Sequence, residues 1–231
     1  GTAHAIYQAK EFIKPKDDIL IVYADEILLD DITNLYELVN GYDGIIFSRE
    51  VKDPENYGVL LHENNILIGL IEKPKSPPSN LVNVGMYYFF DGYNFINHFV
   101  KIVLDKGEND IGEFFLTDAF INMINEGKKI LIKSVNDLDT GSVEKLLSAN
   151  KILLNGSVSK DVNVILENTQ LFENVSIGKN SKLINCKVRS SIIGNDVLLE
   201  GLEIEDSIIG NNVTVKMNGK KFNLGSNSSI I

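Results

Sequence analysis

The sequence is poor in several residue types that would each suggest a particular class of protein. It has one cysteine, Cys186, no tryptophan and three histidines among 231 residues. A single cysteine cannot form an intramolecular disulfide, and with so few histidines it gives no zinc-binding spacing. These absences exclude a disulfide-stabilised secreted fold and favour a reducing, cytoplasmic location.

Long hydrophobic runs and an excess of basic residues are also lacking. No apolar run reaches the about 18 residues that cross a bilayer, and no basic region leads into an apolar core at the start. Lysine and arginine number 22 against 32 acidic residues, a formal net charge of −10. The field of the whole molecule therefore repels nucleic acid and anionic membranes, and we expect neither as a partner. An anionic ligand needs a local basic site or a metal ion.

Helix and strand patterns alternate through the first two thirds of the chain. The continuous apolar run 19–24 is typical of a strand buried on both faces, which predicts a parallel sheet. The other expected strands are 44–47, 57–62, 66–71, 84–90 and 130–135, and the expected helices are 2–12, 30–39, 93–103, 112–125 and 142–154. We interpret residues 1–154 as one α/β layer domain.

Residues 155–231 follow a different period. The segment 191–197, SIIGNDV, returns sixteen residues later as SIIGNNV at 207–213. Aliphatic residues recur there at steps of six, five and five, namely Ile177, Leu183, Val188, Ile193, Leu199, Ile204, Ile209 and Val215. This period predicts three short strands per turn, and we expect a left-handed parallel β-helix of about three to four turns. No histidine follows His98, so the histidine base of β-helix acyltransferases is lacking and a structural or oligomer-forming role is favoured.

Three features could carry chemistry. Asp25 follows the apolar run 19–24, where open α/β sheets bind ligands, but from position alone a cap on the next segment is the favoured interpretation. Residues 139–141, Asp-Thr-Gly, resemble the active-site loop of aspartic proteases, yet they follow a strand, open a helix at Ser142 and have no second copy. A capping turn is the favoured interpretation there. Lys73 precedes a Pro/Ser-rich loop and says little alone.

Several short segments, taken in order, resemble those of the sugar-1-phosphate nucleotidyltransferases. They are 1–6, 24–25, 51–54 with 57–59, 72–74, 79–80 with 84–87, 112–113 with 116–119, 139–141 with 146–150, and 222–228. The closest resemblance is to the long-form glucose-1-phosphate thymidylyltransferases, which carry a β-helical tail. The resemblance implies an α/β, doubly wound, Rossmann-like domain followed by the β-helix.

The resemblance also implies a reaction and its residues. The reaction is nucleotidyl transfer from dTTP or UTP to a sugar 1-phosphate, with glucose 1-phosphate expected, assisted by Mg²⁺. The implied catalytic residues are Lys73, Asp25 and Asp139, the metal ligands are Asp25 and Asp139, and the substrate-binding residues are Gly58, Glu72, Lys73, Asn83 and Gly1. Ala24, Phe115, Asn136 and Asp137 depart from the residues usual in the family.

One family element is missing from these residues. The family begins with a strand and a glycine-rich loop that binds the triphosphate, a βαβ element of about 30 residues or more. We therefore expect an incomplete catalytic domain that does not turn over alone. We also expect the strand at 19–24 to have an open edge, covered by a preceding segment or another chain.

Two other functions remain open. One is an inactive sugar-phosphate-binding or assembly subunit, and the other is a β-helix acyltransferase. A homo-oligomer is expected, and the β-helix is one candidate for its interface.

Overall fold

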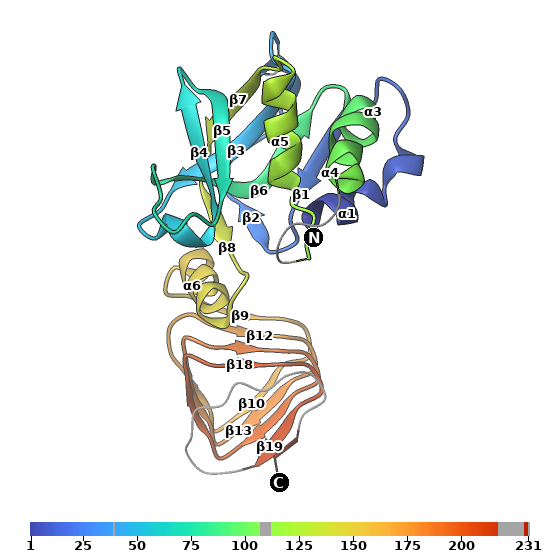
Figure 1. Cartoon of the computed structure of the whole chain (residues 1–231). Helices are drawn as coiled ribbons and strands as arrows, with labels where there is room; N and C mark the ends of the chain where they lie inside the picture. The colour runs from blue at the N-terminus through green and yellow to red at the C-terminus, as the bar shows by residue number, and fades with distance from the viewer. Residues whose placement is uncertain (39, 107–111, 217–228, 231) are drawn as a thin grey trace. The chain divides into compact units, whose positions relative to one another are not determined.

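The computed structural model describes residues 1–38, 40–106, 112–216 and 229–230 (Figure 1). Internal contacts divide the chain into two units, Gly1–Asp137 and Leu138–Ile231. This division assigns helix α6 (Val143–Leu154) to the second unit, whereas the predicted boundary follows that helix and remains a prediction. The family-like segment 222–228 lies outside the described residues.

A mixed sheet forms the centre of the first unit. Its strands are β1 (Ile19–Val22), β3 (Gly44–Glu50), β4 (Gly58–Glu63), β5 (Ile66–Glu72), β6 (Leu81–Phe89) and β7 (Ile130–Ser134). They are ordered β1-β6-β3-β7-β5-β4. Among the described pairings of this sheet, only the β3–β7 pair is parallel. The hairpin of β4 and β5 is confirmed, with Asn64 and Asn65 at φ 49° and 63° in its turn.

The prediction of a doubly buried parallel strand at 19–24 is wrong. β1 pairs antiparallel with β6, and Leu20 and Val22 are 45% and 49% exposed. β1 lies at the edge of the sheet, because among the described strands β6 is its one neighbour. An edge strand covered on one face leaves alternate side chains outside the core, whatever their hydrophobicity.

Helices cover one face of this sheet and pack against its largest apolar cluster (Figure 1). They are α1 (Thr2–Tyr7), the continuous run of α3 (Gly92–Asn94), the π-helical η3 (Phe95–Val100) and α4 (Lys101–Asp105), and α5 (Leu116–Asn125). Stacked Phe89 and Phe95, with ring centroids 3.7 Å apart, join this layer to the sheet. The opposite face packs against α2 (Leu35–Leu38) and residues of β2 (Glu26–Leu28).

Three predicted helices are shorter than expected. The helix predicted for 112–125 begins at Leu116, because Phe115 is extended and the Leu116 N–H donates to Thr2 Oγ1 at 3.0 Å. The helix predicted for 2–12 ends at Tyr7, before the 3₁₀ turn η1 (Lys10–Phe12). The helix predicted for 30–39 begins only at Leu35 with α2, since the Asp31 carboxylate accepts the Thr33 N–H at 2.8 Å in a local turn.

The second unit is α6 followed by three stacks of short parallel strands (Figure 1). One stack contains β9 (Val158–Lys160), β12 (Val175–Ile177), β15 (Ile192–Ile193) and β18 (Ile208–Ile209). The second contains β10 (Ile165–Glu167), β13 (Lys182–Ile184), β16 (Leu198–Glu200), β19 (Thr214–Lys216) and β20 (Ser229–Ile230), and the third contains β11 (Gln170–Leu171), β14 (Lys187–Arg189) and β17 (Glu203–Glu205). The predicted period is confirmed.

The interior of these stacks matches the repeat in detail. Ile177 is in register with Ile193, and Ile193 with Ile209, and each is at most 3% exposed. The glycines align at one corner, where a Cβ on Gly194 would lie 2.6 Å from Asn211 Oδ1 and 2.8 Å from the backbone of the next turn. Only glycine leaves room for that approach.

None of the helices that the structure describes is both long and apolar enough to span a membrane.

Candidate functional site

Gly58, Glu72 and Asn83 come together from three strands of the first unit. Gly58 is opposite Glu72 across the β4–β5 hairpin, and β4 also pairs with β6 next to Asn83. Asn83 Nδ2 donates to the Gly58 carbonyl at 3.2 Å. A Cβ on Gly58 would overlap Asn83 Nδ2 and lie 3.2 Å from Glu72 Oε2. The absent side chain is therefore what lets a carboxylate and an amide share this corner of the sheet.

The Asn83 amide is fixed by the protein itself. Its Oδ1 accepts hydrogen bonds from the Gly85 N–H at 3.1 Å and from the Tyr87 hydroxyl at 2.9 Å. With Nδ2 donating to Gly58, Asn83 orients the backbone of its neighbours and has one further amide hydrogen to offer a ligand.

Glu72 has a carboxylate in partly buried surroundings at the end of β5. Burial raises the pKa of Glu72, Lys73 opposes this shift, and the nearby charges of Asp118 and Glu113 reinforce it. Thr117, in the first turn of α5, hydrogen-bonds to the same carboxylate. A partly desolvated carboxylate of this kind is a strong acceptor for hydroxyl groups.

Lys73 follows Glu72 in an unusual backbone conformation. Its φ is 43°, a region that non-glycine residues outside asparagine and aspartate seldom adopt, and its N–H donates to the Tyr57 carbonyl at 3.0 Å. The side chain is exposed, and within the described ranges no carboxylate lies within 4.0 Å of its ammonium group. Such backbone strain concentrates at functional sites, and the lysine charge remains available to an anion.

Asp25 lies exposed in the turn between β1 and β2, not at the end of a buried strand. Tyr23 lies within electrostatic range of both Asp25 and Glu72. Burial raises the pKa of Tyr23, hydrogen bonds with Thr2 and Tyr87 oppose that shift, and the charges of Glu72 and Asp25 both add to it. Asp25 and Glu72 are thus close enough to Tyr23 to act on one hydroxyl.

Asp139, in β8 (Asp137–Asp139), has a carboxylate that is 12% exposed. Its oxygens accept the Lys145 ammonium at 2.5 Å and the Gly141 N–H at 2.9 Å. Ser142 Oγ accepts the Lys145 N–H at 3.3 Å and caps α6. The capping turn favoured from the sequence is therefore present at 139–142.

The predicted magnesium ligands, Asp25 and Asp139, are both aspartates. Asp25 and Asp139 supply hard carboxylate oxygens, and Mg²⁺ is commonly bound by one or two carboxylates together with substrate phosphates and water. Within the residues described, no group of three or more histidine, cysteine or acidic side chains could hold a metal by itself. Each side chain has the donor chemistry that Mg²⁺ prefers, and the assignment of Asp25 and Asp139 as its ligands stays a prediction.

Gly1 is the N-cap of α1 and packs against the segment before α5. A Cβ at Gly1 would overlap the Phe114 carbonyl and lie 2.6 Å from the Phe114 nitrogen. The Ala3 N–H donates to that carbonyl at 3.0 Å. Gly1 therefore has a structural reason to be glycine, and its predicted contact with a nucleotide base stays a prediction.

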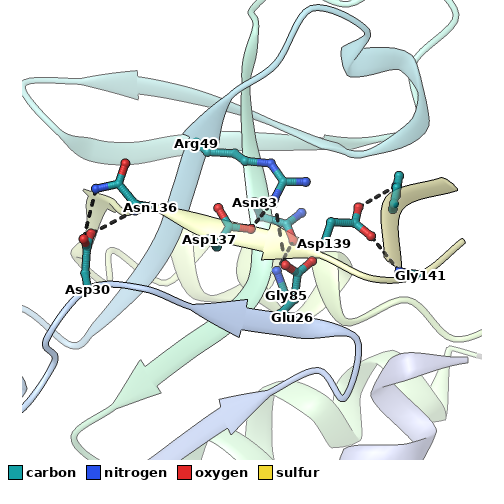
Figure 2. A network of polar contacts seen from close by, with 10 residues as sticks. Glu26, Asp30, Arg49, Asn83, Gly85, Asn136, Asp137, Asp139 and Gly141 are labelled. Atoms are coloured by element: carbon teal, nitrogen blue, oxygen red, sulfur yellow. Dashed lines mark hydrogen bonds and ion pairs between the residues drawn. The ribbon is translucent and has the colours of Figure 1, made fainter. Parts of the chain in front are cut away.

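A charged network that the sequence did not single out lies beside Asn83 (Figure 2). Arg49, on β3, forms ion pairs with Asp137 and, at 3.8 Å, with Glu26 Oε2. The Asp137 side chain is only 2% exposed. The available signal was an arginine two residues after the apolar run 44–47, together with Asp137, one of the positions that depart from the resemblance.

A separate groove of about 610 Å³ lies elsewhere on the first unit. It is lined by Leu38, Glu50, His62, Asn65, Ser79, Asn80, Leu81, Leu131, Ile132, Lys133 and Ser134. None of the seven predicted site residues lines it, so volume and predicted chemistry point to different places. The converging polar groups are the stronger candidate site, because this groove is open and its lining is of mixed polarity.

Comparison with known proteins identifies relatives for both the sequence and the fold. A family model described as "Nucleotidyl transferase" matches residues 1–156. The "Bifunctional protein GlmU" of Methanococcus maripaludis strain C7 is 37% identical over 182 residues, covering 77% of this chain and 41% of that protein. The protein of the same name from Methanocaldococcus jannaschii is 32% identical over 186 residues, covering 77% and 42%. The chain thus spans about two fifths of the length of these relatives.

Two solved structures resemble the fold. A putative glucose-1-phosphate thymidylyltransferase from Bacillus anthracis gives a TM-score of 0.55 at 24% identity, covering 66% of this chain and 60% of that one. An apo UDP-glucose pyrophosphorylase gives 0.55 at 23% identity, covering 67% and 60%. At these identities the likeness shows the fold alone. The predicted fold class is confirmed, with a Rossmann-like α/β unit followed by parallel strand stacks consistent with a left-handed β-helix.

Proposed function

The chain belongs to the nucleotidyl transferase family, and from this premise we propose that it binds a sugar 1-phosphate for nucleotidyl transfer from a nucleoside triphosphate. The observation that carries the proposal is the meeting of Gly58, Glu72 and Asn83 at one corner, with the strained and exposed Lys73 next in the chain. This arrangement offers acceptors for sugar hydroxyls and a cation for the phosphate.

The proposed reaction needs alignment and charge neutralisation more than a strong base. An oxygen of the sugar phosphate, already anionic at neutral pH, forms a bond to the α-phosphorus of the triphosphate. The bond from that phosphorus to the bridging oxygen breaks, and pyrophosphate leaves with its electron pair. Lys73 offsets the repulsion between two polyanions, and a positioned cation of this kind contributes most in a site with restricted water.

The sugar is oriented by groups that the fold already holds in place. Glu72 accepts a hydroxyl hydrogen, the Gly58 backbone lines the ring edge without steric conflict, and Asn83 keeps that backbone in position. Asp25 and Asp139 would hold Mg²⁺, which when bound neutralises charge on the phosphates.

We propose glucose 1-phosphate and dTTP or UTP as the substrates. The sequence resemblance to long-form thymidylyltransferases supports this choice, as do the printed names of the two structural neighbours. The relatives whose printed name is "Bifunctional protein GlmU" keep a second activity open. The 231 residues alone would bind the sugar phosphate without turnover. We also propose a homo-oligomer, for which the β-helix is one candidate interface.

The test is pyrophosphate release by the full-length protein. Each of dTTP and UTP is paired with glucose 1-phosphate or N-acetylglucosamine 1-phosphate, with Mg²⁺ and with EDTA. Release that requires both substrates and stops with EDTA supports the proposal. Binding of a sugar phosphate without release, in a protein whose nucleotide site is intact, would instead support the inactive sugar-phosphate-binding subunit.

A further inference from the structure

We propose that Arg49 is a positioning residue for sugar-phosphate binding, holding Tyr57 so that Tyr57 in turn fixes Lys73. The inference rests on the proposed function, because it assigns a role within the same site. Nothing in the family-like segments pointed to Arg49, and it is the contacts of its side chain that suggest the role.

The guanidinium of Arg49 is held from two directions. Asp137 forms an ion pair with Nη1, and Glu26 Oε2 lies 3.8 Å from the same nitrogen (Figure 2). The side chain is 17% exposed, Asp137 is 2% exposed and Glu26 is 13% exposed. Two acidic groups therefore share one partly buried cation, and removing that cation would leave Asp137 buried beside a second carboxylate.

This partnership keeps Arg49 from acting as a direct phosphate ligand. Burial lowers the pKa of Arg49, but the charges of Asp137 and Glu26 and a hydrogen bond with Tyr57 outweigh it and raise the pKa. Oδ1 of Asp137 has no hydrogen-bond partner within the part of the chain that the structure describes. Both ion pairs engage Nη1, so the guanidinium is directed at Asp137 and Glu26.

Tyr57 carries the effect of Arg49 to the site. The Arg49 guanidinium carbon lies 5.5 Å from the centre of the Tyr57 ring, within the range of a cation–π contact. The Tyr57 carbonyl accepts the Lys73 N–H at 3.0 Å, and Gly58 is the next residue. The ring of Tyr57 is thus fixed by Arg49 while its backbone supports both the strained Lys73 and the start of β4.

The test compares R49Q and R49K with the wild-type full-length protein. We expect R49Q to raise KM for the sugar 1-phosphate about 10- to 100-fold, with KM for the triphosphate unchanged. R49K keeps the charge and should recover part of the loss. In the 231-residue chain, hydrogen exchange at the Lys73 amide should accelerate in R49Q, while the amides of β3 and β6 keep their protection.

Two further variants distinguish this role from misfolding of R49Q and from a general effect of replacing an arginine. Y57L leaves Arg49 with both carboxylates, so it should fold, and it should reproduce the KM change of R49Q. Arg189 supplies a matched control, because it pairs with Glu173 and lies 4.5 Å over the Phe172 ring in the second unit. R189Q should leave both KM values unchanged.

Three outcomes would overturn the inference. They are an unchanged sugar-phosphate KM in R49Q and Y57L, an equal rise in both KM values, and unchanged exchange at Lys73. Failure of the wild-type protein to use or bind any sugar 1-phosphate would overturn the proposed function instead. The Lys73 exchange would then still decide whether Arg49 positions this segment.

Discussion

The negative charge of Glu72 should lower the stability of the fold and strengthen sugar-phosphate binding. Because burial raises its pKa, the folded chain holds a proton on Glu72 more tightly than the unfolded chain does. Stability is then lost as pH rises from the ordinary range of a glutamate through the raised value, and it is recovered as pH falls.

The variant E72Q tests this conflict. It should have a higher Tm than wild type at pH 7, with a smaller difference at pH 4, since the neutral amide carries no desolvation penalty. It should also weaken sugar 1-phosphate binding at least about tenfold, through loss of a charged acceptor. Thermal melts and calorimetric titration measure the two effects. E63Q, at the exposed end of the same hairpin, is the control, and a Tm difference independent of pH would show that the burial of Glu72 has no such effect.

At the scale of elements, local chemistry made some structure predictable. Asn64-Asn65 between two apolar alternating runs predicted the β4–β5 hairpin, because asparagine tolerates the positive φ that such turns require. Ser142 before a helical pattern predicted the start of α6 in the same way.

Other elements depended on neighbours that the sequence does not display. The apolar run 19–24 could not reveal that β1 pairs antiparallel and lies at an edge, since hydrophobicity is the same in either place. The start of α5 at Leu116 is set by Thr2, 114 residues away, through a hydrogen bond that no local pattern encodes.

The repeat of the second unit gives a sharp element-scale prediction. Ile193 points into the stack and is 2% exposed, whereas its neighbour Ile192 is partly exposed. I193D should destabilise the second unit by at least about 3 kcal/mol, because it buries an unpaired charge. I192D should cost no more than about 1 kcal/mol.

Hydrogen exchange measured peptide by peptide separates the two variants. In I193D the peptides of β12 to β19 should exchange early, while β3 and β6 keep their protection. Equal costs for the two substitutions would contradict the inward and outward assignment.

At the scale of the whole molecule, β1 leaves one edge of the sheet and the apolar side chains of Leu20 and Val22 exposed. Tyr23 donates its N–H to Gly85 on β6, so the alternate residues Leu20 and Val22 direct their backbone groups away from that neighbour. Exposed apolar edges invite pairing with further strands, and we predict that another segment or chain covers this one.

Replacing Leu20 and Val22 together by lysine tests this expectation. The 231-residue chain should self-associate through the β1 edge, and L20K/V22K should remove that association in light scattering. I68K, at an exposed apolar position on β5, should leave it unchanged. A monodisperse wild-type monomer with a bare edge would show that the edge needs no cover.

The sequence anticipated the candidate site unevenly for a physical reason. Gly58, Glu72 and Asn83 were inferred from a resemblance, and the fold brings them into contact. Arg49 was missed, and Asp137 was noted only as a departure from the family. Their ion pair joins β3 to a strand 88 residues further on, so neither charge alone indicated a partner. Networks of long sequence separation are visible only once the sheet order is known.

The central claim is that the corner formed by Gly58, Glu72 and Lys73 binds a sugar 1-phosphate. The most direct measurement is a nuclear magnetic resonance titration of the isotopically labelled 231-residue chain with glucose 1-phosphate and Mg²⁺. We predict saturable shifts of the amides of Gly58, Glu72 and Lys73 that are lost in K73A, which should remain folded, and retained in K75A. Shifts confined to the groove around His62 and Lys133, or shifts that persist in K73A, would contradict the claim.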